Sequence, residues 1–159
     1  MAITEKLSKD SKTEIPMIIS VDDHLVEPPH LWQTWLPNKF KEKGPRIERR
    51  RLGEMLWVGG SKMYEYELDA PDAPWCDIWF YEDLVYPNKR HVAAVGFARE
   101  EMTMSPITYD EMRPGCYEPK ARVEDMISNH VEASLSFPTM PRFCGQTFAE
   151  AEDRELALA

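Results

Sequence analysis

The chain has 159 residues and a formal net charge of −9, with 43% hydrophobic and 30% charged residues. This length suits one domain with a hydrophobic core and is too short for two domains of ordinary size. The acidic charge argues against a general nucleic-acid-binding protein, because neutralising phosphates requires a basic surface. A membrane span is not expected either, since no apolar run approaches the roughly 18 residues that cross a bilayer.

The N-terminal segment and the cysteines indicate where the protein works. Residues 1–15 are polar and lack periodicity, so we expect a disordered lead-in before an ordered domain over residues 16–159. Because this lead-in has mixed charges, we do not expect it to be a secretory signal. Cys76, Cys116 and Cys144 are odd in number and form no Cys-x-x-Cys pair. Reduced thiols and a cytoplasmic location are therefore expected.

The first apolar run ends in two acids and an imidazole. Residues 17–21 are β-branched or apolar apart from Ser20 and follow Pro16, which predicts a buried strand. Because side chains alternate along a strand, Asp22 and His24 are expected on one face and Asp23 on the other. A carboxylate and an imidazole on one face make half a metal site, since zinc takes three or four ligands. The alternative is that the acids start a turn and His24 is a hydrogen-bonded residue near the core.

The next hundred or so residues divide into a short helix and a long irregular stretch. Apolar residues between 30 and 36 recur at helical spacing and predict a short amphipathic helix. Residues 38–117 are rich in Pro, Gly, Trp and acids, so we expect a long insertion or lid there. Within it, residues 46–58 are predicted to form a small hairpin that turns at Gly53. The aromatic residues between 75 and 81 are expected to pack this loop.

Regular structure is predicted to return toward the C-terminal end. Apolar spacing predicts a helix over residues 121–129 and a second strand over 131–137. A strand, a crossover with a helix and another strand form the βαβ pattern, which predicts parallel pairing. The following loop leaves the same sheet edge as Asp22 and His24, where α/β folds bind ligands. Arg142 in this loop is a candidate for binding an anionic substrate group; the alternative is a surface salt bridge.

Three short motifs resemble the N-terminal part of the amidohydrolase superfamily. The closest similarity is to its metal-dependent hydrolases and to decarboxylases like aminocarboxymuconate-semialdehyde decarboxylase. It is strong over residues 17–36 and 119–159 and loose over 38–117. The resemblance implies an α/β fold, the N-terminal portion of a TIM-type (β/α)8 barrel whose long insertion carries a small hairpin. The motifs are Asp22-Asp23-His24-Leu25-Val26-Glu27-Pro28, Phe137-Pro138-Thr139 and Arg142-Phe143-Cys144-Gly145.

The resemblance also implies a chemistry. Carried over by position, Asp22 and His24 become ligands of a divalent ion, with zinc expected first and manganese as the alternative, because a carboxylate opens the motif. The implied reaction is hydrolysis or non-oxidative decarboxylation of a small carboxylate or carbonyl substrate.

The resemblance covers only part of that family's fold. Its later strands, with a further His and Asp, are missing from the sequence, and a full barrel takes about 250 residues. We therefore expect an incomplete barrel, inactive alone, that forms homo-oligomers through exposed strands. The alternative is a non-catalytic piece with a structural or interaction role.

Overall fold

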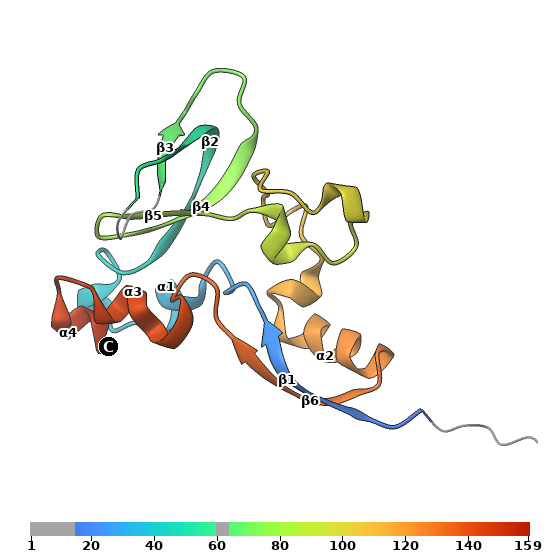
Figure 1. The fold of residues 1–159 in the computed structure, drawn as a ribbon. Helices are drawn as coiled ribbons and strands as arrows, with labels where there is room; N and C mark the ends of the chain where they lie inside the picture. The colour runs from blue at the N-terminus through green and yellow to red at the C-terminus, as the bar shows by residue number, and fades with distance from the viewer. Residues whose placement is uncertain (1–14, 60–63) are drawn as a thin grey trace, which may run out of the picture.

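The structure, a computed structural model, describes residues 15–59 and 64–159. Figure 1 shows two separate sheets with short helices around them: a parallel pair of strands and a four-stranded antiparallel sheet. The predicted lead-in over residues 1–15 lies outside the described residues except for Ile15. In the described ranges, no helix is long and apolar enough to cross a membrane.

The elements follow one another in a mixed order of strands, helices and 3₁₀ turns. The strands are β1 Ile18–His24, β2 Arg46–Trp57, β3 Tyr64–Leu68, β4 Trp75–Tyr81, β5 Leu84–Pro87 and β6 Val131–Phe137. The α-helices are α1 Leu31–Trp35, α2 Pro119–Ser128, α3 Gln146–Ala149 and α4 Arg154–Ala157. The 3₁₀ turns are η1 Asn38–Phe40, η2 Arg90–Ala93, η3 Arg99–Glu101, η4 Pro114–Cys116 and η5 Phe143–Gly145.

Strands β1 and β6 pair in parallel, which confirms the pairing predicted from the βαβ pattern. Ile18 lies opposite Val131 and His24 opposite Phe137, with irregularities in the register between these ends. The connection contains α2, which begins at Pro119, a residue suited to the first helical position because it lacks an N–H group. The C-terminal ends of both strands therefore reach the same edge of the sheet.

The four-stranded sheet has the order β3-β2-β4-β5, and all its neighbours are antiparallel. The hairpin predicted over residues 46–58 is wrong, because β2 runs unbroken through Gly53. A Cβ atom at Gly53 would lie 2.7 Å from the Cβ of Ala70 and would also meet the carboxylate of Glu67. Glycine is thus required by the close approach of the chain around β3, and the turn expected at this position does not form.

The barrel predicted from the family resemblance is also wrong for the described chain. Strands of a (β/α)8 barrel are parallel and buried on both faces, whereas four of the strands here are antiparallel. The stretch 38–117, expected to be an irregular insertion, holds that antiparallel sheet. In the parallel pair, Ile19 is 66% exposed and Leu135 is 58% exposed. One βαβ unit predicts only one pair of parallel strands. The error was to extend this pair to a whole barrel on the basis of the family resemblance.

The hydrophobic core lies around the antiparallel sheet and the loops beside it. One cluster lies around Ile107 and Met112, a second joins Leu36 to Leu156, and a third lies around Ile78. None of the buried apolar residues of the described chain belongs to β1 or β6. The parallel pair of strands therefore lies at the surface of the described structure and adds no residue to its hydrophobic core.

Candidate functional site

The pair Asp22 and His24 lies at the C-terminal end of β1. His24 Nε2 is 3.7 Å from Asp22 Oδ1, and the two side chains are 64% and 82% exposed. The predicted shared face is therefore found, and the position of His24 near the core is not. Both groups face solvent at the sheet edge where the two parallel strands end.

Asp23 points to the other face and has a structural role. Its carboxylate accepts hydrogen bonds from Ser134 of β6 and from Ser20 at 2.8 Å, and it pairs with Arg122 Nη2 of α2 at 2.8 Å. The hydrogen bonds from Ser134 and Ser20, together with the charge of Arg122, hold the pKa of Asp23 below its ordinary value of 3.8. Asp23 thus ties β1 to β6 and α2, and leaves Asp22 and His24 as the outward pair.

The geometry of this pair fits two positions of a divalent metal site. Two ligand atoms at about 2.1 Å from one tetrahedral zinc ion lie roughly 3.4 Å apart, close to the observed 3.7 Å. Within the part of the chain that the structure describes, no His, Cys, Asp or Glu completes a group of three. The remaining positions would fall to water, to substrate or to another protein segment.

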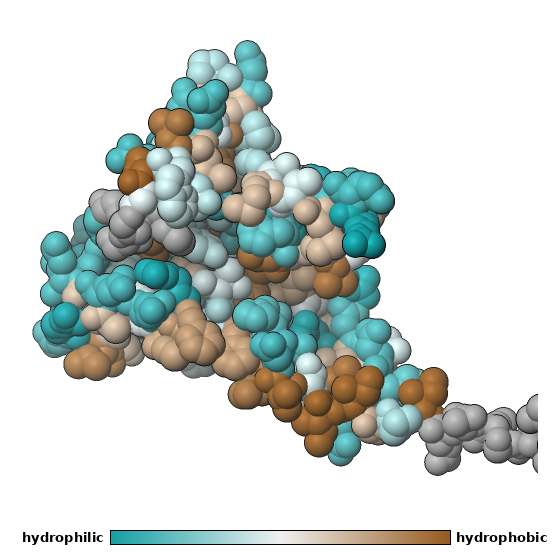
Figure 2. All heavy atoms as spheres, in the orientation of Figure 1, coloured by the Kyte–Doolittle hydropathy of each residue, from teal (hydrophilic) through white to brown (hydrophobic). Residues whose placement is uncertain are grey.

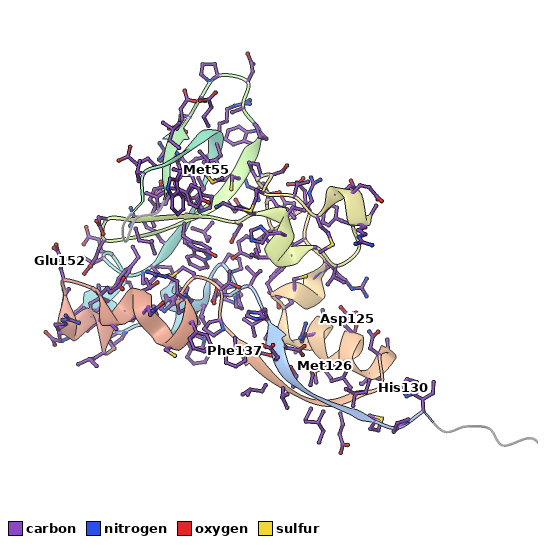
Figure 3. All side chains as sticks on the ribbon, viewed as in Figure 1. Met55, Asp125, Met126, His130, Phe137 and Glu152 are labelled. Carbon is purple, nitrogen blue, oxygen red and sulfur yellow. The ribbon has the colours of Figure 1, made fainter. Side chains whose placement is uncertain are left out.

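Aromatic side chains border His24 on the β6 side. The rings of His24 and Phe137 have centroids 5.8 Å apart, and Phe137 stacks on Phe143 at 5.9 Å with an interplanar angle of 27°. Figure 3 shows Phe137 at one end of β6 and His130 at the other. This wall gives one side of the Asp22–His24 pair an apolar, planar character.

The buried carboxylate of Glu27 was missed by the sequence reasoning, which placed it in an extended turn. Glu27 is 3% exposed and accepts hydrogen bonds from the backbone N–H groups of Thr139 at 2.7 Å and Met140 at 3.1 Å. Burial raises the pKa of its carboxyl, an effect that the backbone donors partly offset. Tyr109 also donates its hydroxyl to the Glu27 carbonyl at 2.7 Å. Glu27 thus fixes the loop after β6 beside the end of β1. The sequence signal that could have indicated this burial is the position of Glu27 between the apolar pair Leu25-Val26 and two prolines.

Arg142 lies in that loop, and its guanidinium is paired. Its Nη1 donates to Glu150 Oε2 at 3.1 Å, and its side chain is 32% exposed. Its φ of 63° is unusual for a residue other than glycine. The contact matches the surface salt bridge considered as the alternative, and a role in substrate binding stays a prediction.

The other polar candidates lie away from the pair. His130 precedes β6 at the opposite end of the sheet, and His91 lies in η2, where burial lowers its pKa. A cavity of about 570 Å³ lies between β4 and the segment 105–111, and its lining includes Arg49 and Arg90. Neither Asp22 nor His24 lines this cavity, so it belongs to no part of the predicted site.

Comparison with known proteins does not assign the chain to a family. No protein-family model matches it, and a search of curated proteins found none that matches. The resemblance to the amidohydrolase superfamily therefore stays a prediction that depends on the three short motifs quoted above.

Proposed function

We propose that Asp22 and His24 bind a divalent metal ion and that this chain forms part of a metal-dependent hydrolase or decarboxylase. The observation that carries the proposal is the pair itself: a carboxylate oxygen and an imidazole nitrogen 3.7 Å apart, both exposed at the end of a parallel strand. Ligands bind at this edge in sheets with parallel strands. The motif that supplies the pair is also the one that resembles the amidohydrolase superfamily.

The surrounding residues have separate tasks in this proposal. Glu27 holds the loop after β6 in place through its two backbone hydrogen bonds, and Phe137 forms an apolar wall beside His24. Arg142 would exchange Glu150 for an anionic group of the substrate. A divalent ion would polarise a substrate carbonyl or carboxylate and lower the pKa of a bound water. Small carboxylates and carbonyl compounds are the substrate class that these groups suit.

Zinc is the first candidate for the ion because an imidazole and a carboxylate are among its usual ligands. Manganese is the alternative, since a carboxylate ligand favours harder ions. A cytoplasmic location is part of the proposal. Three free thiols, at Cys76, Cys116 and Cys144, support it because disulfides are rare in that compartment.

A non-catalytic structural or interaction role is the second candidate function. The observation that favours it is the exposure of the parallel pair, in which Ile19 and Leu135 are both more than half exposed. Such a surface suits association with other protein better than it suits catalysis by the chain alone. The two roles differ in whether Asp22 and His24 bind a metal ion, which only the enzymatic role requires.

The test is metal uptake by equilibrium dialysis against zinc or manganese, followed by elemental analysis. Asp22→Asn and His24→Asn are each expected to lose most of the bound metal. Asp72→Asn and His130→Asn are matched controls, because both positions are exposed and have positive φ angles that asparagine tolerates. Equal uptake by all four variants and the unsubstituted chain would refute the ligand assignment and favour the interaction role.

A further inference from the structure

The cavity of about 570 Å³ beside the antiparallel sheet has the size of a site for a small molecule, since such sites measure about 300 to 1,000 Å³. Figure 2 shows many hydrophilic side chains over this upper sheet and the lobe of residues 90–113, while apolar ones gather over β1 and β6 below. Charged, polar and aromatic side chains from separate elements line the cavity, among them Arg49, Trp75, Arg90, Ser105 and Glu111.

Backbone hydrogen bonds build one wall of this cavity. The N–H of Arg90 donates to the carbonyl of Ser105 at 2.9 Å, and the N–H of Ile107 donates to the carbonyl of Asn88 at 3.2 Å. These bonds run the two segments antiparallel to each other. Arg90 and Ser105 are therefore held side by side.

The guanidinium of Arg90 has no hydrogen-bonded carboxylate in the part of the chain that the structure describes. Its ion-pair contact, from Nη1 to Oε1 of Glu101, is 3.9 Å long and exceeds a hydrogen bond. The side chain is only 22% exposed, and its Nε is buried without a partner among the described residues. The ring of Phe97 lies 4.7 Å from Cζ. A partly buried charge without a close counter-ion is unfavourable, so Arg90 is ready to pair with an anion.

The other charged groups of the lining already have partners. Arg49 donates to both carboxylate oxygens of Asp77 at 2.8 Å and also to Asp110. Glu111 accepts hydrogen bonds from the backbone N–H and the hydroxyl of Thr108, at 2.9 and 2.8 Å. A ligand with several negative charges would be repelled by these carboxylates, whereas one negative charge requires only one available guanidinium.

Trp75 and Ser105 supply the remaining contacts for a ligand. Trp75 is 51% exposed at the start of β4, and the guanidinium of Arg51 lies 4.6 Å from its ring centroid. The exposed part of the indole is a flat surface on which another ring can pack. Ser105 Oγ accepts a hydrogen bond from Thr103 Oγ1 at 2.8 Å, which leaves the hydrogen of the Ser105 hydroxyl for an acceptor.

We propose that this cavity binds a small ligand that has a flat aromatic ring and a single negative charge. The anionic group pairs with Arg90 and accepts the hydroxyl of Ser105, and the ring packs against Trp75. A carboxylate and a phosphodiester each offer two oxygens with one charge, which suits the fork of a guanidinium. Neither Asp22 nor His24 lines this cavity, so ligand binding here is independent of metal binding there.

The test is isothermal titration calorimetry of the full chain in buffer freed of divalent ions, with two matched pairs of probes. Indole-3-acetate is compared with neutral indole-3-acetamide, and cyclic AMP with neutral adenosine. At least one charged probe is expected to saturate a single site, and its neutral counterpart to bind about tenfold more weakly. Saturation by only one of them shows whether the cavity takes the carboxylate or the phosphodiester.

Substitutions in the cavity separate the contribution of the charge from that of the ring. Arg90→Gln is expected to abolish the preference for the charged probe, while Arg90→Lys keeps the charge and part of the preference. Trp75→Leu should weaken the charged and neutral probes alike, by about fivefold. Arg99→Gln is the control, because Arg99 is exposed in η3 and does not line the cavity. Far-UV circular dichroism establishes that each variant is folded.

Three results would overturn the proposal: no saturable binding of either charged probe, equal binding of each charged probe and its neutral counterpart, or a preference that survives Arg90→Gln. Indole ¹H–¹⁵N NMR of the unsubstituted chain supplies a second readout. The Trp75 signal is expected to shift on titration, while Trp35 and Trp57, which are 78% and 66% exposed outside the cavity, stay in place. Shifts at those two with none at Trp75 would also refute the site.

Discussion

The carboxylate of Glu27 accepts a 2.7 Å hydrogen bond from the backbone N–H of Thr139, joining the segment after β1 to the loop after β6. A second bond, from Met140 at 3.1 Å, uses the other carboxylate oxygen. These contacts connect residues more than a hundred positions apart. They set the distance between Asp22 and His24 on β1 and the loop that carries Arg142.

Replacement of Glu27 by alanine is expected to destabilise the fold. Two amide N–H groups in a buried setting would lose their acceptor, which costs about 3 kcal/mol in the free energy of unfolding. Glu27→Gln keeps one acceptor oxygen, so its free energy of unfolding should lie between those of Glu27→Ala and the unsubstituted chain. Urea denaturation monitored by tryptophan fluorescence measures all three.

The matched control is Glu65→Ala, which removes an exposed carboxylate from β3. Its free energy of unfolding should stay close to that of the unsubstituted chain. Equal effects at Glu27 and Glu65 would show that the buried hydrogen bonds contribute nothing specific.

The stabilisation that Asp23 gives to the folded chain is expected to be lost at acid pH. Hydrogen bonds from Ser134 and Ser20 and the charge of Arg122 lower the pKa of Asp23 in the folded state below 3.8. Between this lowered pKa and 3.8, the unfolded chain therefore binds more protons than the folded chain. The contribution of Asp23 to the free energy of unfolding is complete above pH 3.8 and is lost as the pH falls through the folded pKa. The difference in unfolding free energy between the unsubstituted chain and Asp23→Asn should shrink on acidification. A difference that stays constant with pH would contradict this linkage.

The bidentate pair between Arg49 and Asp77 is expected to stabilise the antiparallel sheet. Both hydrogen bonds are 2.8 Å long, and Asp77 is 2% exposed, so Arg49→Met leaves a buried carboxylate without its cation. The expected cost is about 3 kcal/mol in the free energy of unfolding. Arg50→Met is the control, since its partner Asp69 is exposed and such pairs contribute little. Comparable losses in thermal and urea denaturation would refute the special role of the buried pair.

Local sequence patterns predicted the elements around the parallel sheet well. The strand over residues 131–137 has the predicted bounds, and the helix expected over 121–129 is found at Pro119–Ser128. The first strand was predicted to be buried, which is wrong, because Ile18, Ile19 and Val21 are 48–67% exposed. It was also predicted to end at residue 21 but continues to His24, because β6 pairs with it that far. Apolar periodicity marks where an element lies, whereas pairing sets where it ends.

The antiparallel sheet escaped prediction because its strands depend on contacts distant in sequence. β2 is rich in arginine, and its pairing with β4 places Arg49 opposite Asp77 and Arg50 opposite Cys76. These pairings carry no local signal, so the stretch was taken for an insertion. The aromatic residues of Trp75–Tyr81 form β4 itself and do not act as packing for a loop.

The candidate site was predicted in part. Alternation along a strand placed Asp22 and His24 on one face and Asp23 on the other, and the structure confirms this arrangement. The anchoring role of Glu27 was not predicted, because its partners are backbone N–H groups that no side-chain pattern reveals. The pairing of Arg142 with Glu150 likewise depends on the fold of the last loop.

Metal binding by His24 and Asp22 is the central claim, and a zinc titration followed by imidazole ¹H–¹⁵N NMR tests it most directly. The chain has four histidines, so His30, His91 and His130 act as internal controls in the same sample. The account predicts a saturable shift of the His24 resonances that Asp22→Asn weakens, while the other three stay in place. Shifts shared by all four histidines, or a His24 signal that zinc leaves unmoved, would contradict it.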